Sequence, residues 1–523
     1  MNALETAYAI KPEQGDTQLR ASPTFPATEQ LLVEGGDARI ILNPATGSNK
    51  YGCRPRPDTN IAAFGSATAT TISASSFFAA NQLRNRLAQH AATEDAADIY
   101  ADEMQRIRHE LIELCELGHC HGLDIIFAAS GTDVHLIAAQ LAAQAGPAAV
   151  RILIVDPAET GSGVPAALSG RHFSSRSALG DAVTQNSMLA QSGRNDVVAI
   201  PIRLADGTSR PGADIDADFE QQVAMAAAAG QRVLLTMVDV SKTGMIAPSV
   251  ECAVGLHQRF PDTLDVLVDA CQFRIAPTTL QAYLEQGFMV SVTGSKFITG
   301  PSFSGALLIP EKLSKKLRTG AVADKLQAYS ARADWPASWG KARQLDGVAN
   351  FGLLLRWEGA IKELRAFRSV SNAAATHFLR TFAEAIQMHL AGNPVFEALP
   401  VPQLQRRPFA STPGWDDTQT IFPFLLFHPV GTSGKTPLSS AETAQIYLAL
   451  QNEAHGIDRV QLAQPVACGQ RDGIAVSALR MCASSRLIVE AAQHNGRDEQ
   501  VVIKRALRAL DKVAQLVQTA AWR

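Results

Sequence analysis

Two ionisable residues stand near the ends of consecutive β-rich runs in the middle of the chain. Asp269 lies at the end of the run LDVLVDA, and Lys296 directly follows the run FMVSVTGS. The helical stretch TTLQAYLEQ separates the two runs, so the pattern predicts one strand–helix–strand unit whose parallel strands end at the same edge of a sheet. We expect both side chains to be buried there, which is costly unless they bind something.

Pyridoxal 5′-phosphate (PLP) would account for both groups. Its pyridinium nitrogen takes a carboxylate partner and its aldehyde takes an amine, so Asp269 and Lys296 together predict a PLP site. The plainer alternative is a buried Asp–Lys ion pair that only supports the fold. Lys242 follows another apolar run, RVLLTMVDV, and is a rival for the aldehyde, although it follows no Gly-Ser turn.

A third strand end carries groups that suit a phosphate. Ser130, Gly131 and Thr132 come directly after the β-rich run DIIFAA and before a helical stretch. Glycine allows the backbone to approach closely, the hydroxyls can donate, and a helix N-terminus favours an anion. A plain helix N-cap would use the same residue types, and the lysine of a nucleotide-binding P-loop is missing.

The residues around these strand ends resemble the class V aminotransferase and cysteine desulfurase family. TGSKFITGPSFSGAL resembles the lysine motif of that family, VDACQ its aspartate motif, and VSKTGMIAP the loop that passes beside the cofactor ring. The resemblance extends over residues 125–310. It implies an aminotransferase-like PLP fold type I in which Lys296 holds the cofactor as a Schiff base and later acts as the general base.

The resemblance also implies roles for other residues. Asp269 would pair with the ring nitrogen, and Arg480, in the late strand VSALRMCAS, would bind the substrate carboxylate through its planar fork. An exposed, salt-bridged arginine is the alternative for Arg480, and Arg54 and Arg56 are expected to be solvated loop residues. The predicted cofactor-binding residues are Ser130, Gly131, Thr132, Ser241, Asp269, Gln272, Thr293, Ser295 and Lys296.

Three positions depart from the family pattern. The histidine that usually stacks on the ring is missing, and the matching stretch lies near Glu159 and Thr160. Val240 or Ser241 replaces the ring-side asparagine, and Lys242 stands where an acid is usual. The chain is therefore expected to be an atypical member of the family.

Composition sets the broad class. A chain of 523 residues with 46% hydrophobic and 19% charged residues predicts a soluble globular protein of more than one domain. The net charge of −3 gives no reason to expect nucleic acid or an acidic membrane as a partner. Seven scattered cysteines favour reduced thiols in a cytoplasmic protein, and we expect neither a signal peptide nor a transmembrane segment.

Alternating β-rich and helical stretches predict the architecture, an α/β fold with a mostly parallel sheet sandwiched by helices. We expect an N-terminal arm over residues 1–60 and a large PLP-binding domain over 61–345. A linking helix and a smaller C-terminal α+β domain would occupy 346–523. The fold family implies a homodimer.

The predicted function is a PLP-dependent enzyme that acts on an amino acid or amine, as an aminotransferase or a related lyase. A cysteine desulfurase-like lyase that uses Cys468 is a rival, although the family's cysteine would align nearer Val466. A PLP-fold protein without turnover, and an oxidoreductase that uses Gly161 and Gly163, also stay open. The cluster of Cys and His at 115–121 predicts a helix end, and no metal is expected.

Overall fold

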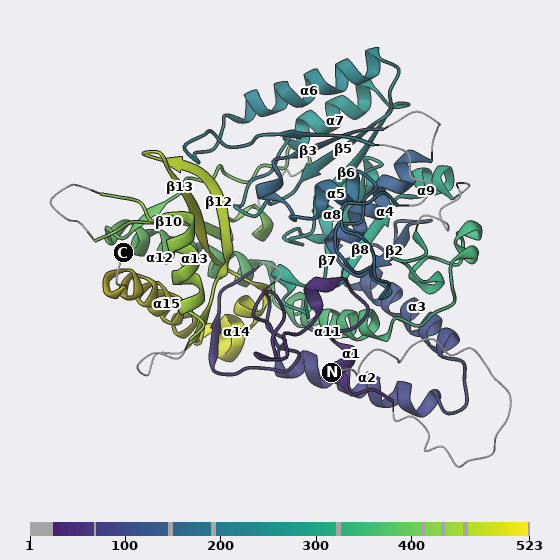
Figure 1. The fold of residues 1–523 in the computed structure, drawn as a ribbon, viewed down its shortest axis with the longest axis horizontal. Helices are drawn as coiled ribbons and strands as arrows, with labels where there is room; N and C mark the ends of the chain where they lie inside the picture. Colours follow the sequence, from purple (N-terminus) through teal and green to yellow (C-terminus); the bar gives the residue numbers. More distant parts are fainter. Residues whose placement is uncertain are drawn as a thin grey trace.

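The core of the molecule is a seven-stranded sheet with helices on both faces (Figure 1). The computed structural model describes residues 25–66, 69–144, 150–189, 195–318, 320, 326–409, 414–429, 435–452 and 459–520. The strands in spatial order are β2 (Asp124–Ala128), β8 (Gly305–Ile309), β7 (Met289–Thr293), β6 (Leu264–Ala270), β5 (Val233–Val238), β3 (Arg151–Val155) and β4 (Asp196–Ile200).

Only one strand of this sheet runs against the others. Strand β8 pairs antiparallel with both β2 and β7, and every other pairing is parallel. The predicted mostly parallel sheet is therefore confirmed, but strands β4 and β8 were not predicted. Since β2 and β7 both oppose β8, they point the same way and end at the same edge.

Alternate side chains of each strand enter two different hydrophobic layers. On β2, Ile125 and Phe127 belong to one cluster, while Ile126 and Ala128 belong to the other, as the twofold period of a strand requires. The helices that follow the strands are α4 (Gly131–Ala143), α5 (Val164–Leu168), α6 (Gly212–Ala228), α7 (Val250–Arg259) and α8 (Pro277–Glu285). Because α4 and α5 cover one face and α7 and α8 the other, the inner strands β5, β6 and β7 are buried along their whole length and are mostly apolar.

A second, antiparallel sheet is built by the C-terminal part of the chain. Its strands in spatial order are β12 (Ala463–Arg471), β13 (Ile474–Cys482), β10 (Ile421–Leu426) and β9 (Phe396–Ala398). Its helices are α12 (Asn372–Gly392), α13 (Ser440–Ala449), α14 (Ser485–Gly496) and α15 (Glu499–Thr519). A buried ion pair joins it to the large sheet, because Arg406 donates to both carboxylate oxygens of Asp239, each at 2.8 Å.

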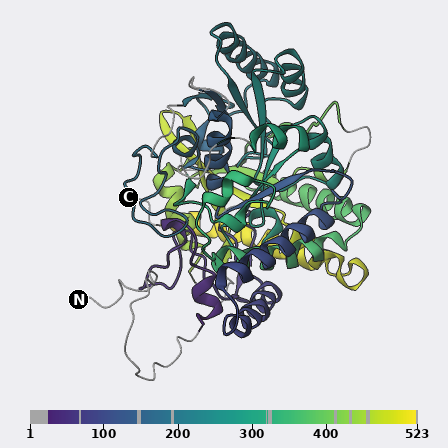
Figure 2. The same ribbon diagram turned by 90° about the vertical axis from the view of Figure 1, so that its right-hand side faces the viewer.

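The N-terminal segment is held against distant parts of the chain. Strand β1 (Ile61–Ala63) pairs in parallel with β11 (Arg459–Gln461), and Figures 1 and 2 show this purple segment beside the yellow C-terminal elements. Helix α11 (Phe351–Arg368) packs on α2 (Ala74–His90) and α3 (Ala96–Leu114). From α11, the fully buried Arg356 donates to the carbonyls of Leu32, Glu34 and Gly35.

Three further expectations concern the cysteines, the cluster at 115–121 and membrane-spanning helices. All seven cysteines lie among the described residues and are unpaired, and the cluster at 115–121 follows the end of α3 at Leu114. Among the described helices, none combines the length and apolar character that crossing a membrane requires.

Candidate active site

Asp269 and Lys296 lie at the same edge of the large sheet. Strands β6 and β7 are parallel, with Asp269 opposite Ser291, and Lys296 lies three residues beyond Thr293, the last residue of β7. Asp269 is buried as expected, but Lys296 is only half-buried, so the expectation of two buried charges was wrong for the lysine. Partial exposure lowers the desolvation cost of an ammonium relative to full burial.

The backbone at this edge is strained where the candidate residues lie. Lys296 has φ +58°, and the β-branched Val240, after β5, has φ +63°. Non-glycine residues rarely adopt the left-handed region, and such strain concentrates at functional sites. Phe273, shortly after β6, has φ +54°. The loops after three neighbouring strands therefore share this feature.

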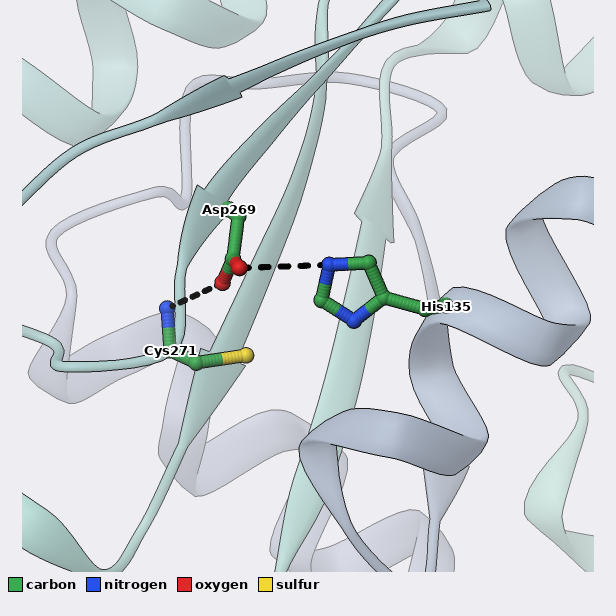
Figure 3. Close-up of side chains that lie close together, drawn as sticks. All are labelled: His135, Asp269 and Cys271. Carbon is green, nitrogen blue, oxygen red and sulfur yellow. Dashed lines mark hydrogen bonds and ion pairs between the residues drawn. The ribbon is translucent and has the colours of Figure 1, made fainter. Parts of the chain in front are cut away.

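Asp269 is ion-paired with a histidine that sequence reasoning missed (Figure 3). His135 Nε2 lies 3.2 Å from Asp269 Oδ2, and His135 Nδ1 lies 2.7 Å from the carbonyl oxygen of Gly131, to which it donates. Burial alone would raise the pKa of Asp269, but the adjacent charge of His135 outweighs it, and that pKa is held well below its usual range. Burial likewise opposes charge on His135, but Asp269 raises the pKa of the imidazole above its ordinary value.

This ion pair leaves the lysine available. The alternative interpretation, an Asp269–Lys296 ion pair, is not what forms, since Asp269 pairs with His135. Within the described part of the chain, the Lys296 ammonium makes no hydrogen bond or ion pair. An amine free of a structural partner can serve as a nucleophile or base.

The same corner has the residue types of a metal site. Potential ligand atoms of His135, Asp269 and Cys271 all lie within 4.8 Å of one another. A thiol must lose its proton to bind a metal, yet burial and the charge of Asp269 raise the pKa of the Cys271 thiol well above its usual range. The chemistry of these donors therefore suits the His–Asp pair better than a metal.

The predicted phosphate-binding residues do come together. Gly305 of β8 is paired with Ala128 on one side and with Thr293 on the other. Thr293, the last residue of β7, and Ser130, two residues after the end of β2, therefore lie on either side of β8. A Cβ atom on Gly131 would lie 2.8 Å from Cys271 Sγ, which shows why only glycine fits. Ser130 is the N-cap of α4, and its hydroxyl accepts from the Asp133 amide at 3.3 Å.

Residues Ser130, Gly131 and Thr132 are called the phosphate cradle, because they are predicted to bind the phosphate. The N-terminal segment places an arginine against it. Arg39 Nη2 donates to Ser130 Oγ at 3.2 Å, and Arg39 Nη1 donates to Thr132 Oγ1 at 3.4 Å. By contrast, Arg54 and Arg56 are exposed, and Arg56 pairs with Glu29. The sequence offered no signal for Arg39, because it lies in a single short 3-10 turn, Ala38–Ile40, 91 residues before Ser130.

Glu159, near the position at which the resemblance predicts a ring-stacking residue, makes contacts with three other side chains. It accepts from Ser241 Oγ and Thr243 Oγ1, both at 2.7 Å, and from Arg203 Nε at 2.6 Å. Burial raises the pKa of Glu159, but Arg203 outweighs it and the net pKa is lowered. Ser241 thus orients this loop in the structure. Next to Glu159, the hydroxyl of Thr160 is buried without a partner among the described residues.

Lys242 and Arg480 are neighbours on the C-terminal side of the site. Lys242 Nζ donates to the carbonyl of Ala158 at 3.1 Å, and burial, then repulsion from Arg480, lower its pKa to about 8. Arg480 is buried on β13, so the exposed alternative was wrong; it donates to the carbonyls of Lys242 at 3.0 Å and Gln464 at 2.6 Å. Its Nε atom has no partner in the part of the chain that is described.

The other predicted residues are Gln272, Thr293, Ser295 and Cys468, and the first three lie in or just after strands β6 and β7. Gln272, directly after β6, accepts from Ser66 Oγ at 3.4 Å, Thr293 Oγ1 donates to the Cys271 carbonyl at 2.6 Å, and Ser295 is buried. Cys468 lies on β12, and it lines a cavity of about 230 Å³ together with Glu159 and Arg203. Burial raises the pKa of its thiol.

Comparison with known proteins identifies the fold. No protein-family model and no curated protein matches the chain. Among solved structures, a NIFS-like protein matches at 13% identity over 86% of this chain and 99% of its own, with a TM-score of 0.52. Mouse CSAD in its apo form matches at 16% identity over 87% and 84%, with a TM-score of 0.51.

A third match points to the same fold. Catharanthus roseus tryptophan decarboxylase, solved in complex with L-tryptophan, has 13% identity over 87% of this chain and 82% of its own, with a TM-score of 0.50. The chain therefore has the α/β architecture of PLP-dependent fold type I enzymes, with the mostly parallel sheet that the sequence predicted. Identities this low define the fold and not the reaction.

Proposed function

We propose that this chain binds PLP at the edge of β6 and β7 and acts on an amino acid or amine. The observation that carries the proposal is the combination of Asp269, kept anionic by His135, with the unpaired Lys296 at the same sheet edge. When bound, PLP would supply an electron sink for the substrate carbon. The shared fold supports the proposal, since its relatives include a tryptophan decarboxylase complexed with L-tryptophan.

The proposed roles follow from the charges and positions of the side chains. Lys296 would bind the aldehyde carbon and, once substrate replaces it, would take or return a proton at Cα. Asp269 would hold the proton on the ring nitrogen, because a carboxylate with a lowered pKa stays ionised at neutral pH. Gln272 would approach the ring hydroxyl, while Ser130, Gly131, Thr132, Thr293 and Ser295 would surround the phosphate.

The substrate would be bound by two cationic residues, Arg480 and Lys242, on the C-terminal side of the site. The buried Arg480 has a free Nε–H, and its neighbour Lys242 adds a second positive charge. We propose that Arg480 binds the substrate carboxylate, for which a guanidinium fork is suited. Both residues also fix the loop over Glu159, since Arg480 donates to the Lys242 carbonyl.

The decisive experiment is spectroscopic. Purified protein supplied with PLP should absorb visible light, and borohydride should shift that band and attach PLP to the peptide that contains Lys296. Lys296→Ala should abolish the band, whereas Lys242→Ala, the matched control, should keep it. A colourless protein that fails to bind PLP would refute the proposal, and trapping on Lys242 would reassign the lysine.

The reaction itself is proposed as transamination or a related lyase reaction. A screen of single amino acids against the PLP-loaded protein should find some that perturb the visible band. Formation of a keto acid would identify an aminotransferase, and release of carbon dioxide would identify a decarboxylase. If no amino acid or amine changes the spectrum, the protein is a PLP-binding protein without turnover.

One observation keeps a desulfurase-like lyase as the second candidate. Cys468 lines the cavity next to Glu159 and Arg203, although its raised pKa and its place on a strand disfavour a thiolate. Sulfide or alanine release from cysteine that Cys468→Ser abolishes would establish this candidate. Release that survives the substitution would exclude the role of Cys468.

We also propose the quaternary and domain organisation that the fold suggests. The chain would form a homodimer, with an arm over 1–60, a large domain over 61–345 and a linking helix and small domain over 346–523. Light scattering coupled to size exclusion should give the mass of two chains of 55.8 kDa. A single-chain mass for the PLP-loaded protein would contradict the dimer.

A further inference from the structure

We infer that Arg39, from the N-terminal segment, is the cation that binds the phosphate group of the cofactor. The inference rests on the proposed PLP function and deepens it. Its basis is that both terminal nitrogens of Arg39 donate to the hydroxyls of the predicted phosphate cradle, Nη2 to Ser130 at 3.2 Å and Nη1 to Thr132 at 3.4 Å. No other Lys or Arg of the described residues has a hydrogen bond to these hydroxyls.

The guanidinium of Arg39 is fixed before any ligand arrives. Asp37, which is fully buried, accepts from Arg39 Nε at 2.8 Å and from Nη2 at 2.6 Å. The rings of Phe303 and Phe173 lie 5.2 and 5.6 Å from the guanidinium carbon, within cation–π range. The N–H groups of a guanidinium held in this way point in fixed directions.

The bonds to the hydroxyls are the ones that a phosphate could replace. At 3.2 and 3.4 Å they are longer than the bonds to Asp37, and hydrogen bonds weaken with length. With a phosphate between Arg39 and the N-terminus of α4, the two long bonds from Arg39 to neutral hydroxyls would be replaced by bonds to a charged acceptor. Hydrogen bonds between two charged partners are shorter and stronger. The Thr132 hydroxyl would then be free to donate to the same group, while the Ser130 hydroxyl donates to Asp133 Oδ2 at 2.5 Å.

The local charge balance permits an anion here. Asp37 formally neutralises Arg39, and a second acid, Asp133, lies beside Ser130 with Oγ–Oδ2 at 2.5 Å. Burial, together with the charge of Asp37, raises the pKa of Asp133 to about 7. Near neutral pH Asp133 therefore carries less than a full negative charge, which reduces its repulsion of an anion. The N-terminal N–H groups of α4 supply further positive potential.

The position of Arg39 depends on contacts far along the chain. The buried Arg356 of α11 donates to Leu32 O at 3.3 Å and to Gly35 O at 2.6 Å, just before the turn that carries Arg39. The Ala38 amide donates to Ser174 Oγ at 3.2 Å. These bonds hold the segment over the cradle, so the cation comes from a part of the chain that precedes the large sheet.

Comparing PLP with pyridoxal tests the inference, because pyridoxal lacks only the phosphate. Apo protein, prepared by removing cofactor with hydroxylamine, is titrated with each ligand and followed by absorbance. Arg39→Gln should weaken PLP binding by about 10- to 100-fold, the loss expected for charge-assisted hydrogen bonds, and should leave pyridoxal binding within about 2-fold. Arg56→Gln, an exposed arginine of the same segment, should change neither affinity.

The outcomes separate the inference from the proposed function. Equal losses for PLP and pyridoxal, or no loss for PLP, would overturn the role of Arg39 while PLP binding by the wild type stands. If the wild type binds neither ligand, the proposed function itself fails. If circular dichroism shows that Arg39→Gln does not fold, Arg39→Lys decides in the same way: it keeps the charge without the fork, and a loss confined to PLP supports the inference.

Discussion

His135 Nε2 lies 3.2 Å from Asp269 Oδ2, and both side chains are buried. The pair links helix α4, which begins at the phosphate cradle, to strand β6, which carries the proposed partner of the ring nitrogen. A single imidazole thus connects two ends of the proposed cofactor site. Its second nitrogen donates to Gly131 O at 2.7 Å, which fixes the orientation of the ring.

Removing His135 should destabilise the protein and weaken the cofactor site. We expect His135→Ala to lower the free energy of unfolding by about 3–5 kcal/mol, because an isolated buried carboxylate remains. His135→Gln can still donate to Asp269 and should cost less. Urea unfolding of the apo proteins at pH 7 measures both. Equal stability of His135→Ala and wild type would show that the pair does not form in solution.

The His135–Asp269 pair should stabilise the fold only within a limited range of pH. The folded-state pKa of Asp269 is lowered from 3.8, so its contribution is present above pH 3.8 and is lost as the pH falls through the folded value. The folded-state pKa of His135 is raised from 6.5, so its contribution is full below pH 6.5 and is lost as the pH rises through the folded value. The stability difference between wild type and Asp269→Asn should therefore peak between about pH 4 and 6.5. A flat difference across pH 4–9 would contradict it.

Lys242 predicts a stability change at alkaline pH. Its folded-state pKa is lowered from 10.5 to about 8, first by burial and then by Arg480, so the unfolded chain binds the proton more tightly. Stability should rise as the pH increases from 8 to 10.5, because the cost of the buried charge disappears. In Lys242→Met this rise should be absent. Thermal melts of both proteins across that range measure it, and parallel curves would contradict the shifted pKa.

Gly131 should tolerate a side chain only if its neighbour is trimmed. A Cβ atom there would lie 2.8 Å from Cys271 Sγ and 3.3 Å from Thr293 Cγ2, so we expect Gly131→Ala to cost about 1–3 kcal/mol of stability. Cys271→Ala in the same chain removes the closer atom and should restore most of the loss. A double variant as unstable as the sum of both single variants would exclude this contact as the cause.

Removing one partner of the buried ion pair between Arg406 and Asp239 should strongly destabilise the fold. Arg406→Met leaves Asp239 buried without its two bonds of 2.8 Å, and we expect a loss of about 3–5 kcal/mol in the free energy of unfolding. The double variant Asp239→Leu/Arg406→Met should recover part of that loss, since the Asp239 charge is removed with its partner; the recovery is partial because the buried Asp416, 3.8 Å from Arg406, stays. Denaturant unfolding of the four proteins measures the coupling, and strict additivity would refute it.

The sequence by itself predicted the local architecture and the central pair of residues. Continuous apolar runs and helical periodicity predict β6, α8 and β7, and the handed strand–helix–strand connection then brings Asp269 and Lys296 to one edge. The position of residues 130–132 between a β-rich run and a helical stretch added the glycine and the two hydroxyls. These features depend on residues close in sequence, so their pattern can be recognised without coordinates.

Only the tertiary structure decided which groups complete the site. Asp269 pairs with His135 rather than Lys296, and Arg39 reaches hydroxyls 91 and 93 residues away. Arg480 is buried against the Lys242 loop, and Lys296 is half-buried. Such contacts depend on how α4, β13 and the N-terminal segment pack on the sheet edge. Packing between distant segments leaves no periodicity or spacing in the chain. The sequence therefore predicted the strands and the lysine, but not the contacts made by His135 and Arg39.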